Sequence, residues 1–247
     1  MDTAINKTLG VLGGLGPMSS VYFYEMLTEH TSAESDQQHL NILLSSRADT
    51  PDRTAFIMGR SKDNPIHTML SEVSKLIAAG ADVIAIPCNT AHYFYDAISE
   101  AASVPVINII RQTAAFCKQE GIKKAGILAT EGTVSSGAYS SVFSLAGIEC
   151  ICPDESGQAV ISDIIYGQIK KGGEPDMQSF FAVCEQLRAK GCERIILGCT
   201  ELSLLKKSGL LDANIYIDSL EVLAYSAIKL CGKTPAGFDD RLMSFRP

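Results

Sequence analysis

A short apolar run that ends at a cysteine occurs twice in this chain. One copy spans residues 84–90 (IAIPCNT) and the other residues 195–201 (IILGCTE), with Cys88 and Cys199 at matching places. The positions upstream match as well, 111 residues apart: Leu76 with Leu187, Gly80 with Gly191, and Ile84 with Ile195. A helix, the glycine that ends it and a buried strand are therefore duplicated. The register predicts two similar α/β units of about 110 residues.

Strand and helix patterns alternate along the whole chain. We expect strands at 9–12, 41–44, 83–87, 106–109, 125–130, 149–152, 194–198 and 215–217. We expect helices at about 19–30, 66–79, 90–101, from 135 onward, 156–171, 176–190 and 219–231. Strands separated by helix-length segments indicate an α/β fold with mostly parallel sheets and right-handed crossovers.

The repeat predicts two similar domains related by a pseudo-twofold axis. The second repeat is complete before the last helix, so that helix is expected to pack on the first half. The first domain then comprises residues 1–111 plus 218–247, and the second comprises residues 112–217. Ligands of such sheets bind at the carboxyl ends of the strands, where both cysteines lie, so the active site is expected in the cleft between the domains.

Composition and charge exclude several classes of protein. The 247 residues are 46% hydrophobic and 20% charged, as in a globular protein with a sizeable core. A net charge of −7 argues against nucleic acid or an anionic membrane as partner. The N-terminus has no apolar signal-peptide region, so we expect a cytoplasmic protein whose eight cysteines stay reduced. No zinc-type spacing occurs, and no metal is expected.

Cys88 and Cys199 are the candidate catalytic residues. Two thiols on opposite faces of one carbon suit racemisation, in which a thiolate removes the α-proton and a thiol returns a proton from the other side. A free thiol has a pKa of about 8.5, so helix N-termini or cations must favour the thiolate. The remaining six cysteines are expected to be core residues.

Polar residues beside the cysteines and after other strands are candidate substrate ligands. Hydroxyl, amide and backbone N–H groups can hold a carboxylate and stabilise the charge that develops as the α-proton leaves. These candidates are Asn89, Thr90, Thr130 and Thr200. Arg53, expected in a loop, and Lys170, expected late in a helix, are candidates for a second carboxylate. His92 and Glu201 are supporting candidates; for His92, packing is the alternative.

The loop at 13–16 (GGLG) resembles the start of a dinucleotide-binding fingerprint, but the third glycine is replaced by Ser19. The glycines, with Gly14 and Leu15 as supporting site positions, are expected to let the backbone approach a small ligand closely. A nucleotide-binding domain remains an alternative on this loop alone.

Four motifs together resemble the aspartate/glutamate racemase family, and most closely its aspartate racemase branch. They are GGLGP at 13–17, PDRT at 51–54, PCNTAH at 87–92 and LGCTEL at 197–202. The resemblance covers essentially the whole chain. It implies a dimeric two-domain α/β fold and racemisation by two cysteines without pyridoxal phosphate, metal or other cofactor.

The same resemblance implies particular roles for site residues. Cys88 and Cys199 are the acid/base pair. Asn89, Thr90, Thr130 and Thr200 resemble the pocket for the α-carboxylate and amino group. Arg53 and Lys170 resemble the readers of the side-chain carboxylate, and Glu201, where glutamate racemases carry histidine, favours the aspartate branch.

The sequence thus predicts a cytoplasmic homodimeric racemase of an acidic amino acid, aspartate first. Alternatives are a glutamate or broad-specificity racemase, a hydantoin racemase, a maleate isomerase, or a two-lobed protein that binds an amino acid without turning it over. An arylmalonate decarboxylase is disfavoured because it needs only one of the cysteines.

Overall fold

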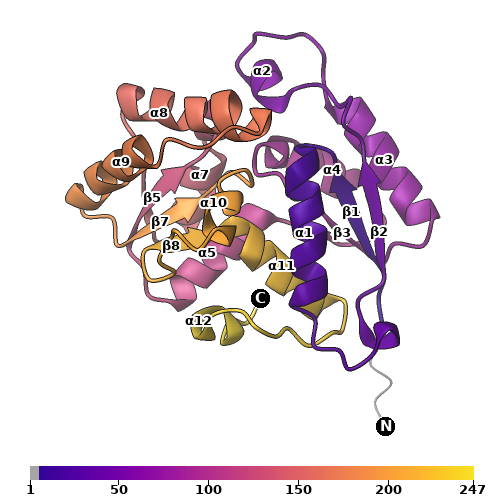
Figure 1. Cartoon of the computed structure of the whole chain (residues 1–247). Helices are drawn as coiled ribbons and strands as arrows, with labels where there is room; N and C mark the ends of the chain where they lie inside the picture. Colours follow the sequence, from indigo (N-terminus) through magenta and orange to yellow (C-terminus); the bar gives the residue numbers. More distant parts are fainter. Residues whose placement is uncertain (1–5) are drawn as a thin grey trace.

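Eight short strands form two sheets with the same strand order (Figure 1). The computed structural model describes residues 6–247. The first sheet has the order β2-β1-β3-β4 and the second the order β6-β5-β7-β8, with every pair parallel. The first sheet contains β1 (Leu9–Gly13), β2 (Ile42–Ser46), β3 (Val83–Ala85) and β4 (Val106–Ile107). The second contains β5 (Lys124–Leu128), β6 (Glu149–Ile151), β7 (Arg194–Leu197) and β8 (Tyr216–Asp218). The predicted fold class, two similar α/β halves with parallel sheets, is confirmed.

Helices connect the strands in both halves. The first half contains α1 (Pro17–Glu29), η1 (Asp36–Gln38), α2 (Arg53–Ile57), α3 (Ile66–Ala78), η2 (Thr90–Phe94), α4 (Tyr95–Ala101) and α5 (Ile109–Gln119). The second contains α6 (Glu131–Ser135), α7 (Ala138–Leu145), α8 (Glu155–Ser162), the π-helix η3 (Asp163–Gln168), η4 (Ile169–Lys171), α9 (Met177–Ala189), α10 (Ser203–Lys207), α11 (Ser219–Leu230) and α12 (Asp240–Met243). Gly80 and Gly191, equivalent in the repeat, follow α3 and α9 with φ of 100° and 89°, the left-handed conformation that favours glycine after a helix.

Several predicted elements are corrected. The strand predicted at 106–109 ends at Ile107, because the Asn108 side chain accepts hydrogen bonds from the N–H groups of Ile110 and Arg111 and begins the unpredicted helix α5. The predicted strands 83–87 and 125–130 end at Ala85 and Leu128. Arg53 lies not in a loop but at the first position of α2, which Asp52 caps. The predicted helix 156–171 is α-helical only to Ser162.

The helix that follows the last strand of each sheet crosses to the other half. α5 follows the first sheet but also contacts α7 of the second half, whereas α11 follows the second sheet and contacts α1, β3 and β4 of the first. The two helices also pack on each other. The predicted domain boundary at 111/112 falls inside α5, and residues 1–5 of the predicted first domain lie outside the described residues; the division into domains stays a prediction.

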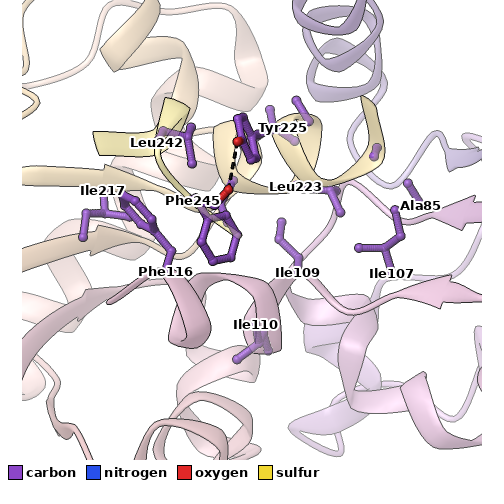
Figure 2. Close-up of a cluster of buried hydrophobic side chains, with 14 of the residues drawn as sticks. Ala85, Ile107, Ile109, Ile110, Phe116, Ile217, Leu223, Tyr225, Leu242 and Phe245 are labelled. Atoms are coloured by element: carbon purple, nitrogen blue, oxygen red, sulfur yellow. Dashed lines mark hydrogen bonds between the residues drawn. The ribbon is translucent and has the colours of Figure 1, made fainter. Parts of the chain in front are cut away.

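One buried apolar cluster therefore joins the two sheets. It includes Ala85 and Ile107 of the first sheet, Ile217 of the second, and Leu223 and Tyr225 of α11 (Figure 2). Near the C-terminus the Tyr225 hydroxyl donates to the Phe245 carbonyl at 2.9 Å. Two further clusters lie within single halves. Burial of this apolar surface fixes how the two sets of strand ends face each other. No helix within residues 6–247 is long and apolar enough to cross a membrane.

Candidate active site

Polar side chains from both halves converge on one small cavity at the carboxyl ends of the sheets. Cys88 lies just beyond β3 and Cys199 just beyond β7, each beside the point where the strand order reverses, the usual ligand site of such sheets. The cavity is lined by Leu15, Asp52, Arg53, Thr54, Cys88, Asn89, Thr90, Thr130, Tyr166, Lys170, Cys199, Thr200 and Glu201. The predicted catalytic cysteines and all six predicted substrate ligands are therefore brought together.

The cavity is nearly filled by its own side chains. Its free volume is about 10 Å³, close to what one water molecule requires. An adjoining cavity of about 600 Å³ opens beside it and is lined in part by the same Asp52, Arg53, Lys170 and Glu201. Gly14 lines this outer cavity, which we call the vestibule. An amino acid could reach the cysteines only if the inner cavity widens.

Cys199 donates a hydrogen bond to a carboxylate. Its Sγ lies 3.0 Å from Oε2 of Glu201, and both side chains are buried. Burial, the charge of Glu201 and this hydrogen bond raise the pKa of Cys199 well above its ordinary value, and Lys170 lowers it by less. Cys199 is therefore a protonated thiol in this closed arrangement.

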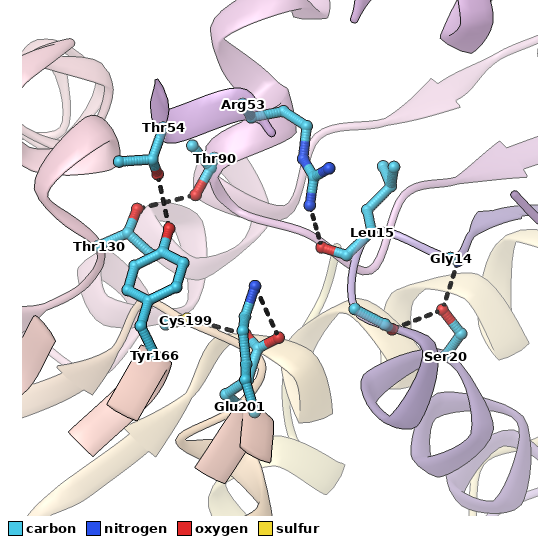
Figure 3. Close-up of polar contacts among 12 residues, drawn as sticks. Gly14, Leu15, Ser20, Arg53, Thr54, Thr90, Thr130, Tyr166, Cys199 and Glu201 are labelled. Carbon is cyan, nitrogen blue, oxygen red and sulfur yellow. Dashed lines mark hydrogen bonds and ion pairs between the residues drawn. The ribbon is translucent and has the colours of Figure 1, made fainter. Parts of the chain in front are cut away.

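The two residues that follow Cys88 join networks of neutral hydrogen-bonding groups. The Thr90 hydroxyl shares a hydrogen bond with the Thr130 hydroxyl at 2.9 Å (Figure 3). It shares another with the Thr133 hydroxyl, also at 2.9 Å. Asn89 donates to the Ser219 hydroxyl at 3.0 Å and accepts from the Tyr139 hydroxyl at 2.7 Å. These bonds hold residues from both halves at fixed positions around the cavity.

His92 lies outside the cavity and contacts the backbone of two segments beside it. Its Nδ1 is 2.9 Å from the Cys88 carbonyl oxygen, and its Nε2 accepts from the Ile109 N–H at 3.1 Å. These two bonds assign the proton to Nδ1. Burial lowers the pKa of His92 to about 4, so the ring is neutral. Of the two alternatives for His92, the structure favours packing.

Arg53 is held by backbone oxygens and keeps one donor free. Its guanidinium donates to the carbonyls of Leu15, Thr50 and Pro51 at 2.6, 3.2 and 3.0 Å. Its Nε–H is buried without a partner among the described residues. A buried donor without a partner is costly, so this position favours an acceptor such as a carboxylate.

Lys170 reaches the cavity from the turn after the π-helix η3. Its Nζ is 3.5 Å from Oε1 of Glu201 and 4.8 Å from the centre of the Tyr166 ring. Burial alone would lower the pKa of Lys170, but the negative charge of Glu201 and the two cysteines of the cavity together more than offset this, and the pKa is raised. Lys170 is therefore a cation.

The glycine-rich loop makes room for protein groups. A Cβ atom on Gly16 would lie 2.4 Å from Oε1 of Glu201, and one on Gly14, where φ is 82°, would lie 2.4 Å from the Arg47 backbone nitrogen. At Gly16 the Glu201 carboxylate lies where a Cβ atom would be, but Gly14 and Gly16 both line the vestibule, and close approach of a ligand to this loop stays a prediction.

Sequence reasoning missed three residues of the cavity. Asp52 and Thr54 flank Arg53, and Tyr166 lies four residues before Lys170. The Tyr166 hydroxyl donates to the Thr54 hydroxyl at 2.9 Å and so joins the two halves across the cavity (Figure 3). The spacing of Tyr166 and Lys170 was the available signal, because residues four apart share a helix face.

All eight cysteines are free. Burial raises the pKa of Cys231 to about 11 and also raises that of Cys117, so these thiols stay protonated and unreactive. Within residues 6–247 no group of three or more His, Cys, Asp and Glu side chains is placed to hold a metal ion.

Two cysteines at equivalent strand ends of a duplicated α/β unit define a class of amino-acid racemase folds, and comparison with known proteins agrees. The family described as Asp/Glu/hydantoin racemase matches residues 12–227, so the chain belongs to that family of racemases. It is 29% identical over 201 residues to the broad specificity amino-acid racemase RacX of Bacillus subtilis (strain 168), covering 79% of this chain and 86% of the relative.

Solved structures show the same arrangement. The aspartate racemase of Picrophilus torridus superposes with a TM-score of 0.80 at 28% identity, over 97% of this chain and 100% of the other. The glutamate racemase of Francisella tularensis, solved with D-glutamate, superposes with a TM-score of 0.59 at 21% identity over 98% of this chain and 85% of the other, a likeness of fold.

Proposed function

We propose that this protein interconverts the enantiomers of an acidic amino acid, aspartate first, with Cys88 and Cys199 as the acid/base pair. The observation that carries the proposal is that the two thiols, supplied by opposite halves, line one cavity together with Arg53 and Lys170. The cysteines supply the proton transfers, and the two cations supply the recognition of a second carboxylate.

In the proposed reaction one cysteine acts as a thiolate and takes the α-proton. The carbanion is stabilised by hydrogen bonds to the α-carboxylate from the Thr90, Thr130 and Thr200 region and from backbone groups near Asn89. The other cysteine, as a thiol, donates its proton to the opposite face. In the reverse direction the two exchange roles, so no redox step or net proton change is involved. A homodimer remains a prediction.

The test is incubation with L- and D-aspartate in deuterium oxide, followed by chiral chromatography and proton NMR. Racemisation from both sides, with solvent deuterium at the α-carbon of the product, is expected. Tight binding of aspartate without loss of the α-proton would instead indicate a binding protein. An active enzyme that ignores aspartate but turns over hydantoins or maleate would reassign the substrate.

A broad-specificity racemase is the second candidate, and the vestibule favours it. The vestibule adjoins Arg53 and Lys170, and its lining includes the apolar Met18, Ile169 and Leu204. A longer side chain could extend into it once the inner cavity widens. The relative RacX carries broad specificity in its name, which agrees with this alternative. A panel of amino acids of increasing length, assayed for α-deuterium exchange, separates the two candidates.

A further inference from the structure

The Glu201 carboxylate lies between a candidate acid/base thiol and a cation. Oε2 accepts from the Cys199 thiol at 3.0 Å, and Oε1 lies 3.5 Å from the Lys170 ammonium (Figure 3). The side chain of Glu201 is only 8% exposed. The carboxylate that accepts the hydrogen bond of the thiol thus has its other oxygen paired with Lys170, a candidate reader of the substrate.

Glu201 is held in this position from the first half. The space that its Oε1 occupies exists because Gly16 has no side chain. Helix α1 begins at the next residue, Pro17, and the N-terminus of a 13-residue helix favours a nearby negative charge. The contact is therefore built by two segments far apart in the sequence, the glycine-rich loop and the turn after β7.

The equivalent position in the first half has no charge. Thr90 matches Glu201 in the repeat, and among the described residues its hydroxyl bonds to two other hydroxyls, those of Thr130 and Thr133. Any role that depends on the Glu201 carboxylate therefore belongs to Cys199 and not to Cys88.

A substrate side-chain carboxylate would compete with Glu201 for Lys170. Both cavities share Lys170, Arg53 and Glu201, so an acidic side chain approaching the two cations from the vestibule meets this ion pair. Once Lys170 turns to the substrate, Glu201 loses its cation and faces a second carboxylate. Loss of Lys170 also disfavours a Cys199 thiolate, but Lys170 interacts more strongly with Glu201 than with Cys199, so the larger loss falls on Glu201, which already accepts the hydrogen bond of the thiol.

We propose that Glu201 couples recognition of the substrate's side-chain carboxylate to activation of Cys199. The proposal rests on the proposed function and specifies how that site selects acidic substrates. Before binding, Glu201 is paired with Lys170 and Cys199 is a thiol. When the substrate carboxylate takes Lys170, the S–H proton moves to Glu201, and the site then holds a Cys199 thiolate and a neutral Glu201. Glu201 acts through Cys199 and is in that sense a positioning residue.

The protons balance over the cycle. The Cys199 thiolate takes the α-proton and becomes a thiol, and the Cys88 thiol protonates the carbanion and becomes a thiolate. After the product leaves, Lys170 returns to Glu201, which releases its proton, and Cys88 regains one. An amide side chain of the same shape, as in asparagine, cannot attract Lys170 as strongly and should leave Cys199 protonated.

The test compares Glu201→Gln with Glu72→Gln. Glu72 is a matched control, because its side chain is 7% exposed and paired with Lys75 at 2.7 Å, outside both cavities. For Glu201→Gln we expect kcat for aspartate to fall by about 100-fold, the usual contribution of a proton acceptor. KM should fall as well, because Lys170 no longer has a competing carboxylate. Glu72→Gln should leave both constants near those of wild type.

A second measurement isolates the two thiols. In a Cys88→Ser background only Cys199 can exchange the α-proton, and in a Cys199→Ser background only Cys88 can. At saturating aspartate in deuterium oxide, Glu201→Gln should slow exchange about 100-fold in the first background and leave it nearly unchanged in the second. Raising the pH should restore the first rate, because solvent can then remove the thiol proton. The charged and titratable groups around this thiol are Glu201, Lys170, Arg53, Asp52, Tyr166 and Cys88.

Three results would overturn the inference while leaving the proposed function intact. They are a kcat of Glu201→Gln equal to or above that of wild type, equal losses in both single-thiol backgrounds, and a loss that high pH does not restore. Absence of exchange in the wild type and in both single-thiol variants would instead refute the proposed function itself.

Discussion

The two cysteines occupy equivalent positions in two similar halves, yet their neighbours differ in kind. Cys88 is followed by Asn89 and Thr90, which join a network of neutral groups. Cys199 is followed by Thr200 and Glu201. The Glu201 carboxylate accepts a hydrogen bond from the Cys199 thiol and is also paired with Lys170. A racemase must treat mirror-image substrates with comparable rates, but the substrate's side chain lies on one side only. The second half therefore places a charged pair, Glu201 and Lys170, beside its thiol, whereas the other cation of the cavity, Arg53, comes from the first half.

A second difference lies beneath each cysteine, at the start of the helix that crosses to the other half. In the first half, neutral His92 accepts from the Ile109 N–H at the start of α5. In the second half the matching residue is Ser203, which donates to Asp218 at 2.7 Å, and Asp218 accepts from the Leu220 N–H at the start of α11. In both halves a titratable side chain thus links the end of a strand to the crossing helix. That side chain is a base, His92, in the first half and an acid, Asp218, in the second.

The largest effect is expected from exchanging either thiol for a hydroxyl. Serine is too weakly acidic to share a proton as cysteine does, so Cys88→Ser and Cys199→Ser should each lower racemisation by about 1,000-fold or more. Each variant should keep α-deuterium exchange for one enantiomer, and the two variants should keep opposite enantiomers. Proton NMR of each enantiomer in deuterium oxide checks this. Full racemisation by either variant would refute the pairing.

The next largest effect is expected on the free energy of unfolding, to which His92 and Asp218 give opposite pH dependences. Burial lowers the pKa of His92 from its ordinary 6.5 to about 4. Between these values the unfolded chain binds the extra proton, so this group stabilises the fold above pH 6.5 and its contribution is lost as the pH falls towards 4. Burial and then the charge of Glu221 raise the pKa of Asp218, whose Oδ2 is buried without a partner among the described residues. Here the folded chain binds the extra proton, so stability is lost as the pH rises above about 4.

Replacing either Asp218 or His92 should leave the pH dependence of stability that the other residue causes. Compared with wild type, the free energy of unfolding of Asp218→Asn should rise more steeply with pH between 4.5 and 6, by up to about 1.4 kcal/mol per pH unit. His92→Asn should change the slope in the opposite direction by a similar amount. Urea unfolding at four or five pH values measures both. Slopes equal to that of wild type would show that these groups do not titrate as their burial requires.

A smaller effect on the kinetic constants is expected from replacing one glycine in each half, Gly16 or Gly132, with alanine. Gly16 and Gly132 occupy equivalent places after β1 and β5, and each leaves room for a residue of the other half. A Cβ on Gly16 would meet Glu201, and one on Gly132 would lie 2.9 Å from the Cα of Thr54 in α2. Overpacking of this kind costs about 1–3 kcal/mol. Gly16→Ala should therefore lower kcat through Cys199, whereas Gly132→Ala should raise KM by displacing the α2 segment that carries Arg53.

Steady-state kinetics with aspartate distinguishes these outcomes, with thermal unfolding as the check on folding. If both alanine variants change the same constant by the same factor, the glycines serve packing alone, and the two halves do not divide recognition and activation between them.

The sequence was sufficient for the features that depend on local pattern. Strand ends, the duplicated register and the polar residues after each strand located Cys88, Cys199, Thr130 and Thr200, because parallel strands place their carboxyl ends at one edge. The contact between Glu201 and Cys199 was not predictable in this way, since it requires Gly16 to approach from the other half. The contact of Tyr166 with Thr54 was not predictable for the same reason, because it joins η3 to α2, which are far apart in the sequence.

The smallest expected effect concerns two contacts that join α2 and the turn after it to the second half. The Tyr166 hydroxyl donates to Thr54 in a partly buried place, whereas Arg60 and Glu131 pair at 2.7 Å with side chains 55% and 38% exposed. Tyr166→Phe should cost about 1 kcal/mol, or about fivefold in kcat/KM. Arg60→Gln should have almost no effect, because solvent screens an exposed pair. The rate at which a thiol reagent modifies the cysteines of the cavity should rise in the first variant only. Equal rates in the two variants would mean that the hydroxyl pair does not hold the cavity closed, and that substrate enters without parting α2 from η3.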